Sequence, residues 1–384
     1  MKKNSIADRS LSLHRKLRGK IEVVGKTPIR NRADLSLVYT PGVGAVSSAI
    51  AKDPRLVDVM TWKRNSVAVV SDGSAVLGLG NIGPLAALPV MEGKCAIFKT
   101  FAGIDAVPIV LSTQDPDEIV KTVIAIAPTF GAIQLEDISA PRCFDIERRL
   151  SRDLDIPVMH DDQHGTAIVV LAGLLNALKV TVKNMTSIRV VISGAGAAGT
   201  AIAHLLHATG AKDVTCCDRN GAIWAGRKDL NVEKAELSTY TNPKHRKGSL
   251  ADVMKGADVL VGTSGPGLVT ADMVRSMAKK AIVFGLANPI PEIMPDIAKS
   301  AGAAVVATGR SDFPNQVNNA LCYPGLFRGM LDRRVNKVTD AIKVRAALAI
   351  AGFIKKPTPE RIIPTMFDKG LHQAVARSVT HRSS

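Results

Sequence analysis

Short apolar runs alternate with longer amphipathic stretches along most of this chain. In the first half, turn or polar residues bound each apolar run, which is typical of a buried strand. Asp115-Pro116 stands before apolar residues at helical spacing, so we expect a helix capped by Asp115. The strands predicted in this half are Val67–Val70, Cys95–Phe98, Val107–Leu111, Ala132–Leu135 and Pro157–Met159.

The second half repeats this alternation. The apolar stretch Thr166–Val180 is too long for a strand and predicts a helix that joins the two halves. Further helices are predicted at Thr339–Lys356 and Thr365–Ser378. Strands that alternate with helices indicate an α/β fold with a mostly parallel sheet. The strands predicted here are Ile188–Ile192, Val214–Cys217, Val259–Val261, Ile282–Phe284 and Ala304–Ala307.

A glycine-rich motif follows the first strand of the second half. Its glycines have the spacing Gly-x-Gly-x-x-Gly and open a segment of helical length, and Asp218 lies 19 residues after the last of them. This pattern is typical of dinucleotide binding, where the glycines permit a tight turn and a close approach to the pyrophosphate. It predicts a Rossmann-like, doubly wound parallel sheet, although a merely tight strand–helix turn is the simpler alternative. The motif consists of Gly194, Ala195, Gly196, Ala197, Ala198 and Gly199.

Two neighbouring residues bear on the choice of cofactor. Asp218 would accept a hydrogen bond from the ribose of NAD, whereas the adjacent Arg219 would pair with the extra phosphate of NADP. The acid favours NAD slightly and leaves NADP open. A second Gly-x-Gly-x-x-Gly segment, Gly78–Gly83, follows a turn, and we interpret it as backbone close to a ligand or to another chain segment.

Two pairs of acids follow predicted strands. Glu136-Asp137 and Asp161-Asp162 both stand at strand carboxyl ends, where open α/β sheets bind their ligands. Four acids in one crevice repel one another unless a cation is present, and carboxylates select Mg²⁺ or Mn²⁺. The alternatives are helix capping by these acids, or a zinc site built from His160 and His164.

The composition excludes several classes of protein. The net charge of +16 comes from the two ends: residues 1–32 carry ten Lys or Arg against two acids, and residues 328–384 carry twelve against four. Aromatic residues make up only 4%, so nucleic-acid binding is disfavoured. No apolar run reaches the roughly 20 residues of a membrane span. Five cysteines without a Cys-x-x-Cys motif favour reduced thiols in a cytoplasmic protein.

Several motifs, taken in order along almost the whole chain, resemble the malic enzymes, and in particular their short prokaryotic form. The resemblance implies oxidative decarboxylation of (S)-malate to pyruvate and CO₂, with reduction of NAD or NADP and a requirement for Mg²⁺ or Mn²⁺. Decarboxylation of oxaloacetate is a further implied activity. The motifs are Val38–Gly44, Gly93-Lys94, Glu136–Ile138, His160–Ala167, Ala287–Pro289 and Asn315–Asn319.

The resemblance also implies a role for each residue of the site. Lys94 is the general base and contacts the substrate, Tyr39 is the general acid, and Asp161 holds Lys94 by a hydrogen bond. We expect a nearby divalent cation and partial burial to lower the pKa of Lys94 towards neutrality. The implied metal ligands are Glu136, Asp137 and Asp162.

Three asparagines complete the implied site, and one group is missing from it. Asn288 resembles the residue that contacts the cofactor ribose or the substrate, and Asn318 with Asn319 resembles a pair near the substrate carboxylates. The larger malic enzymes carry an Arg just before the Gly-Leu-Gly segment, and this chain has none there. Ser74, the backbone of Gly78–Gly83 or Lys99 are the candidate replacements.

We therefore predict two domains: an N-terminal α/β catalytic, metal-binding domain over residues 1–164, and an NAD(P)-binding Rossmann-like domain with C-terminal helices over residues 165–384. A homodimer is expected, and the basic ends are candidates for its interface. Two rival functions remain: a malolactic-type lyase on the same scaffold, and a non-catalytic protein that binds nucleotides or nucleic acid.

Overall fold

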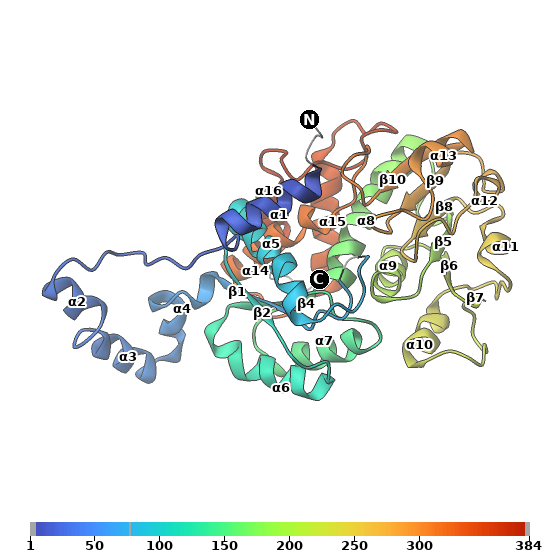
Figure 1. Cartoon of the computed structure of the whole chain (residues 1–384). Helices are drawn as coiled ribbons and strands as arrows, with labels where there is room; N and C mark the ends of the chain where they lie inside the picture. Colours follow the sequence, from blue (N-terminus) through green and yellow to red (C-terminus); the bar gives the residue numbers. More distant parts are fainter. Residues whose placement is uncertain (1–4, 77, 381–384) are drawn as a thin grey trace.

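The computed structural model describes residues 5–76 and 78–380, and it contains two parallel sheets that lie side by side (Figure 1). The first sheet has the strand order β2-β1-β3-β4, with every neighbouring pair parallel. Because the chain passes from β1 to both sides, the carboxyl ends of β1 and β3 form a switch point, which is where such sheets bind ligands. Its strands are β1 (Ser66–Ser71), β2 (Asp105–Val110), β3 (Ala132–Leu135) and β4 (Val158–His160).

The helices of the first sheet include one that corrects a prediction. Cys95–Phe98 is not a strand but part of α5 (Pro84–Ala102). Its apolar run belongs to a helical pattern, because the buried apolar residues recur every three or four positions from Ala87 to Phe98. The predicted helix after Asp115 is confirmed, and the Asp115 side chain caps it. The other helices here are α6 (Pro116–Ile126), η3 (Ala127–Thr129) and α7 (Arg142–Asp153).

The second sheet has the order β10-β9-β8-β5-β6-β7 and is parallel except for the two-residue edge strand β7. All five strands predicted for this half are confirmed within one or two residues. The switch point lies between β5 and β8, as in a doubly wound nucleotide-binding sheet. The strands are β5 (Arg189–Ser193), β6 (Asp213–Asp218), β7 (Gly221–Ala222), β8 (Val259–Gly262), β9 (Ala281–Gly285) and β10 (Ala303–Thr308).

The central helix α8 (Asp161–Thr181) joins the two sheets. It begins five residues earlier than predicted, so both acids of Asp161-Asp162 lie in its first turn. It is long and apolar enough to cross a membrane by composition, but most of it is buried between its neighbours. The helices around this sheet are α9 (Ala197–Ala208), α10 (Val232–Tyr240), α11 (Leu250–Met254), α12 (Ala271–Arg275) and α13 (Pro295–Ser300).

The C-terminal helices pack back onto both halves. The rings of Phe98 on α5 and Tyr323 on α14 lie 4.8 Å apart, so the end of the chain contributes to the core beneath the first sheet. The predicted helix Thr365–Ser378 forms only from Leu371, after a series of turns. These elements are η4 (Asn319–Leu321), α14 (Tyr323–Arg333), α15 (Asp340–Phe353) and α16 (Leu371–Ser378).

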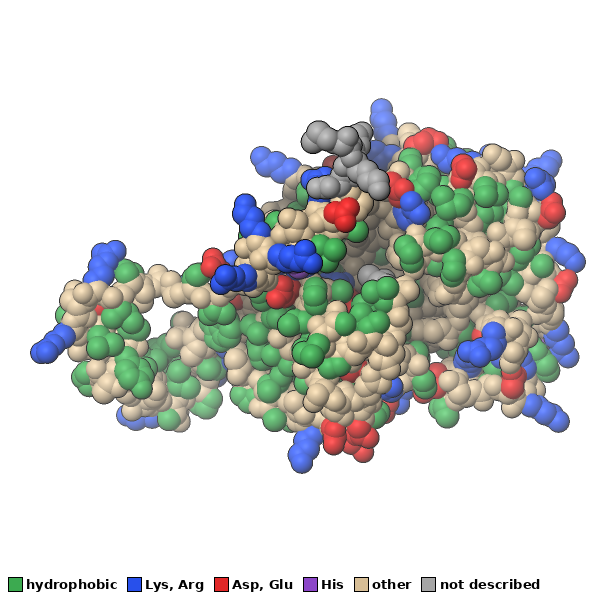
Figure 2. All heavy atoms as spheres, viewed as in Figure 1, with side chains coloured by type: hydrophobic (Ala, Val, Ile, Leu, Met, Phe, Trp, Pro, Cys, Tyr) green, Lys and Arg blue, Asp and Glu red, His purple; other side chains and the backbone are tan. Residues whose placement is uncertain are grey.

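Residues 21–62, which we call the arm, leave the body and return to it. No residue between Ser5 and Asn65 is buried, although the arm carries many apolar side chains. Figure 1 shows its helices projecting to one side, and Figure 2 shows apolar side chains over this projection. Such a segment lacks a core of its own. Before it lies α1 (Ile6–Leu17); its own elements are α2 (Arg32–Val38), α3 (Val43–Lys52), η1 (Pro54–Leu56) and α4 (Val57–Met60), followed by η2 (Lys63–Asn65).

Candidate active site

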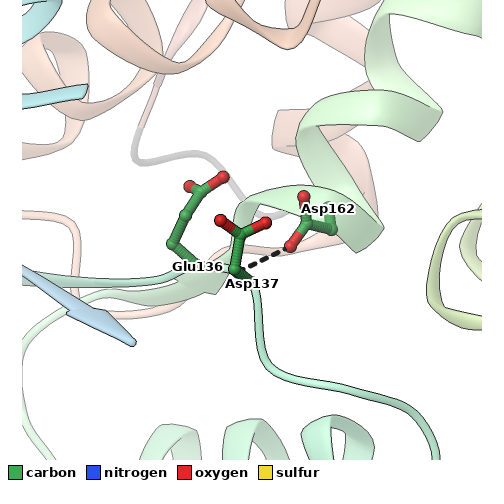
Figure 3. Close-up of side chains that lie close together, drawn as sticks. All are labelled: Glu136, Asp137 and Asp162. Atoms are coloured by element: carbon green, nitrogen blue, oxygen red, sulfur yellow. Dashed lines mark hydrogen bonds between the residues drawn. The ribbon is translucent and has the colours of Figure 1, made fainter. Parts of the chain in front are cut away.

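Three carboxylates converge where β3 and β4 end. Glu136 and Asp137 directly follow β3, and Asp162 lies in the first turn of α8 (Figure 3). One oxygen from each lies within 4.8 Å of the other two. The backbone N–H of Asp137 donates to Asp162 Oδ2 at 2.9 Å, which links the segment after β3 directly to the first turn of α8. Asp137 has a φ of 53°, in the left-handed region that Asp tolerates better than most residues.

The charges around this cluster do not balance within the protein. Glu136, Asp137 and Asp161 are almost fully buried, and Lys94 is the cation bonded to two of them. Burial, reinforced by Asp162, raises the pKa of Asp137 to about 8. Asp137 Oδ2 and Asp161 Oδ1 have no hydrogen-bond partner among the described residues. An all-oxygen site with excess negative charge and unpaired oxygens fits a hard divalent cation such as Mg²⁺ or Mn²⁺.

Lys94 lies on α5 and points into the acids. Its Nζ donates to Asp161 Oδ2 at 2.6 Å, lies 2.9 Å from Glu136 Oε1, and reaches Asn319 Oδ1 at 3.3 Å. Burial lowers the pKa of Lys94, but Asp161 and Glu136 outweigh burial and raise this pKa well above its ordinary value. Without a divalent cation Lys94 is therefore an ammonium, and the expected lowering of its pKa requires that cation to offset the acids.

A steric constraint explains why position 165, near the start of α8, is a glycine. A Cβ added to Gly165 would lie 2.0 Å from Asp161 Oδ1, because the Asp161 side chain folds back over the next helical turn. Asp161 reaches Lys94 from this position. The four-residue spacing from Asp161 to Gly165 is thus required to hold the lysine partner in place.

The two tyrosines near the implied chemistry have opposite positions. Tyr39 follows α2 on the arm, is 65% exposed, and is not brought to Lys94 within one chain. Tyr323 is fully buried, and Lys94 Nζ lies 4.7 Å from the centre of its ring. The Tyr323 hydroxyl has no partner among the described residues, and sequence reasoning gave it no role. Its place four residues after the asparagine motif was the available signal.

The glycine fingerprint lies at the carboxyl end of β5. A Cβ at Gly199 would meet the Gly194 carbonyl oxygen at 1.8 Å, whereas one at Gly196 would meet no atom within 4 Å. The lack of a side chain at Gly199 therefore lets α9 pack closely against the end of β5, and Gly196 leaves open space where α9 begins. A cavity of about 790 Å³ borders this helix start, and its lining includes Gly196, Ala197, Ala198, Asp162, Thr263, Ala287, Asn288, Asn318 and Asn319. Asp162 of the carboxylate cluster and the glycine turn thus line one cavity.

Asp218 ends β6, as the fingerprint requires, but its carboxylate is already engaged. Arg227 binds both of its oxygens, and Lys234 Nζ lies 2.7 Å from Oδ2. Burial raises the pKa of Asp218, yet these two bonds together lower it to about 2. Arg219 is exposed and points to no charged partner in the described chain. A cofactor at this end would meet two cations as well as the acid.

The remaining candidates are placed as follows. Gly78 contacts the Asn288 backbone, since a Cβ there would lie 2.5 Å from the Asn288 carbonyl oxygen. Lys99 is exposed and paired with Asp105, so it does not reach the cavity. Ser74 lines the cavity, and its hydroxyl bonds to Asp72. His164 binds Glu147 rather than a zinc position.

Two family models and several curated relatives match this chain. The family model for the malic enzyme N-terminal domain matches residues 18–151, and the model for the malic enzyme NAD binding domain matches residues 163–382. The chain is 53% identical to the bifunctional malic/malolactic enzyme of Bacillus subtilis (strain 168), over 98% of this chain and 92% of that protein. It is 48% identical to the NADP-dependent malic enzyme of Halomonas elongata, over 94% and 85% of the two chains.

Solved structures give the same result. The crystal structure of the NAD-dependent malic enzyme from Thermotoga maritima superposes with a TM-score of 0.94 at 48% identity, over 96% of this chain and 98% of that one. The malic enzyme from Pyrococcus horikoshii superposes with a TM-score of 0.93 at 46% identity, over 97% and 89%. The chain therefore belongs to the malic enzyme family and is an NAD(P)-dependent enzyme of that type.

Proposed function

We propose that this chain catalyses the oxidative decarboxylation of (S)-malate to pyruvate and CO₂, with reduction of NAD or NADP and with Mg²⁺ or Mn²⁺ bound. The observation that carries the proposal is the shared cavity: Asp162 of the carboxylate cluster and Gly196 of the fingerprint line the same space. A dinucleotide on the glycine turn would therefore reach a substrate held beside the acids. Decarboxylation of oxaloacetate would use the same groups.

The chain's own residues divide the chemistry between them. Glu136, Asp137 and Asp162 would hold the cation, which when bound supplies Lewis-acid stabilisation of negative charge on the substrate oxygens. Once neutral, Lys94 would take the proton of the C2 hydroxyl, and a nicotinamide cofactor, when bound, would supply the hydride acceptor that this oxidation needs. Asp161 holds Lys94 in place for this transfer. Asn318 and Asn319 line the cavity and offer amide groups to the substrate carboxylates.

A general acid must then protonate C3, and the position of Tyr39 suggests how it is supplied. The exposed apolar side chains of the arm need a surface to cover them, and α2, which Tyr39 follows, lies apart from α5, which carries Lys94 (Figure 1). We propose a homodimer in which each arm packs on the partner subunit and brings Tyr39 to the partner's site. A two-fold symmetric exchange of this kind covers both arms and completes both sites.

Mixed dimers test this arrangement. Tyr39→Phe and Lys94→Ala should each lower kcat by about 10²- to 10⁴-fold as homodimers. In a heterodimer of the two variants, one site would regain both groups, so a randomised equal mixture should recover about a quarter of wild-type activity. If native mass spectrometry detects heterodimers and activity does not recover, then Tyr39 and Lys94 act in the same subunit's site, or Tyr39 is not the general acid.

A matched substitution separates the two tyrosines. Tyr323→Phe keeps the buried ring beside Lys94 and removes only the unpartnered hydroxyl. If Tyr39 is the acid, Tyr323→Phe retains kcat within about 2-fold, because a hydroxyl without a partner contributes no hydrogen bond. A loss confined to Tyr323→Phe would instead make Tyr323 the acid and remove the need for exchange.

The reaction itself is tested by product analysis. Malate with each cofactor, with Mg²⁺ or Mn²⁺ and after removal of metal by EDTA, should yield pyruvate and equimolar reduced cofactor only when metal is present. Lactate formed without net cofactor reduction would support the malolactic alternative. One relative is named a bifunctional malic/malolactic enzyme, which is the reason to test for lactate. The ratio of kcat/KM for NAD and NADP decides whether Asp218, or the cations bonded to it, dominates recognition of the ribose.

We further propose a cytoplasmic location. All five cysteines, each within the described residues, are buried and free. Burial raises the pKa of Cys95 to about 12, so this thiol, next to Lys94 in sequence, stays protonated and unreactive. Alkylation of the native protein should therefore modify no cysteine.

A further inference from the structure

A buried carboxylate lies behind the first turn of α8, on the side away from the shared cavity. Glu147 comes from α7 and is 9% exposed. Its Oε1 accepts from the backbone N–H of His160 at 2.8 Å, and its Oε2 contacts Gln163 Nε2 and His164 Nε2, each at 3.0 Å. One side chain thus bonds to the residue before α8 and to two residues of its first turn.

The first turn of α8 needs such a restraint. His160, at the N-cap, makes no side-chain capping bond within the described chain. The turn carries Asp161 and Asp162, which face the like charges of Glu136 and Asp137. Like charges at this distance push the turn outwards unless other bonds hold it. A carboxylate at a helix N-terminus is favoured by the free N–H groups there, and Glu147 supplies one from another helix.

Glu147 is suited to this task because it is charged and fixed. Burial raises the pKa of Glu147, but His164 and the backbone N–H of His160 outweigh burial and lower it below its ordinary value. An ionised carboxylate accepts several hydrogen bonds at once, whereas its amide equivalent presents donors on one side. Glu147 does not belong to the carboxylate cluster and does not line the shared cavity.

We infer that Glu147 is a positioning residue for the metal centre: it holds the first turn of α8 where Asp162 reaches Asp137 and Asp161 reaches Lys94. The inference rests on the proposed function, since it assumes that Asp162 is a metal ligand. Partners outside the ligand set fix ligand orientation, and their loss costs about 10- to 100-fold in metal affinity. His160, whose backbone N–H donates to Glu147, also lies beside Asp162. Its buried ring makes no hydrogen bond among the described residues, and its Nε2 lies 3.7 Å from Asp162 Oδ2.

The test measures metal binding without turnover. Glu147→Gln keeps the shape and places an amide donor against Gln163 or His164, and Glu147→Asp keeps the charge but shortens the side chain. Binding of Mn²⁺ to the cofactor-free protein is followed by electron paramagnetic resonance, and binding of NADH or NADPH by fluorescence. We expect both variants to bind Mn²⁺ about 10- to 100-fold more weakly and the reduced cofactor within about 2-fold of wild type.

A matched control lies on the same helix. Asp145→Asn removes a half-exposed carboxylate of α7 whose ion-pair partners among the described residues are Arg148 and Arg149, and it should leave Mn²⁺ affinity unchanged. Wild-type Mn²⁺ affinity in a folded Glu147 variant would overturn the inference, and so would an equal loss of metal and cofactor binding. If instead wild-type protein binds no Mn²⁺, the proposed function fails, whatever Glu147 does.

Discussion

The two sheet edges that meet at the cavity have the same topology and opposite chemistry. The edge of β3 and β4 concentrates buried charge, with four carboxylates around Lys94. The edge of β5 offers glycine and free backbone N–H groups at the start of α9. The first edge can perform proton transfer and bind a cation, whereas the second can only accommodate and orient a ligand.

Because of this difference, a different kind of substitution should impair each edge. At the charged edge, function depends on the position of single polar atoms, so exchanging one group changes the rate of reaction. At the glycine edge, function depends on empty space, so adding one carbon changes affinity or stability. Five substitutions test this division, in order of expected effect.

Lys94→Ala should have the largest effect. Removing the proposed base should lower kcat by about 10²- to 10⁴-fold, while cofactor binding at the other edge stays within about 2-fold of wild type. Steady-state rates and cofactor fluorescence measure the two. Lys99→Ala is the control, because Lys99 lies on the same helix but is exposed and paired with Asp105. Equal losses in both variants would show that the helix, rather than the base, had been damaged.

Gly165→Ala should act mainly through Asp161, with a lesser contact to Asn319, whose Cβ would lie 3.1 Å from the new methyl group. The new Cβ would lie 2.0 Å from Asp161 Oδ1 and must displace that carboxylate from Lys94. A displacement of about 1 Å at a reacting group costs up to about 100-fold, so we expect kcat to fall by 10- to 100-fold. KM for the cofactor should not change. Unchanged kcat would mean that Asp161 does not position the lysine.

The glycine edge is tested by two alanines three residues apart. Gly199→Ala places a Cβ 1.8 Å from the Gly194 carbonyl oxygen, which should destabilise the fold by several kcal/mol, about 3 or more. Gly196→Ala places a Cβ with no atom of the described residues within 4 Å beyond its chain neighbours, so it should leave Tm nearly unchanged, yet raise the Kd of the cofactor by occupying the space of the pyrophosphate. Thermal unfolding and cofactor titration separate them, and similar Tm values would contradict the assignment.

The candidate residues at the strand ends of both sheets could be predicted from the sequence, because strand ends and turns depend on neighbouring residues. The acid pairs were found directly after apolar runs, and the fingerprint after β5. Cys95–Phe98 was misassigned because a four-residue window of a helix resembles a strand. Glu147 was not found because its bonds to His160 and His164 join elements that only the folded chain brings together.

The arm shows a second limit of sequence reasoning. The motif around Tyr39 marked the residue, but no local pattern states whether its side chain reaches the site of its own chain. That depends on what the exposed apolar side chains of the arm pack against, which no local sequence pattern determines. Tyr323 shows the converse, because folding places its buried ring beside Lys94 of the same chain although sequence reasoning assigned this residue no role.

The smallest expected effect comes from Asp218, a charged residue at the end of β6 in the second sheet. Folding lowers the pKa of Asp218 to about 2, so the folded protein releases this proton more readily than the unfolded chain does. The stability that Asp218 contributes is therefore fully present above pH 4 or so, and is lost as pH falls towards 2. A shift of nearly two units corresponds to about 2 kcal/mol.

Asp218→Asn should therefore lower the free energy of unfolding by about 2 kcal/mol at neutral pH, and the difference from wild type should shrink below about pH 4. Urea unfolding at a series of pH values measures it, with Asp272→Asn as a control whose carboxylate is 89% exposed and paired with Arg275. If the difference persists at pH 3, the pairing with Arg227 and Lys234 is not its source. If cofactor affinity changes far more than stability, charge also governs binding at the glycine edge, and the division between the two edges is less complete than the geometry indicates.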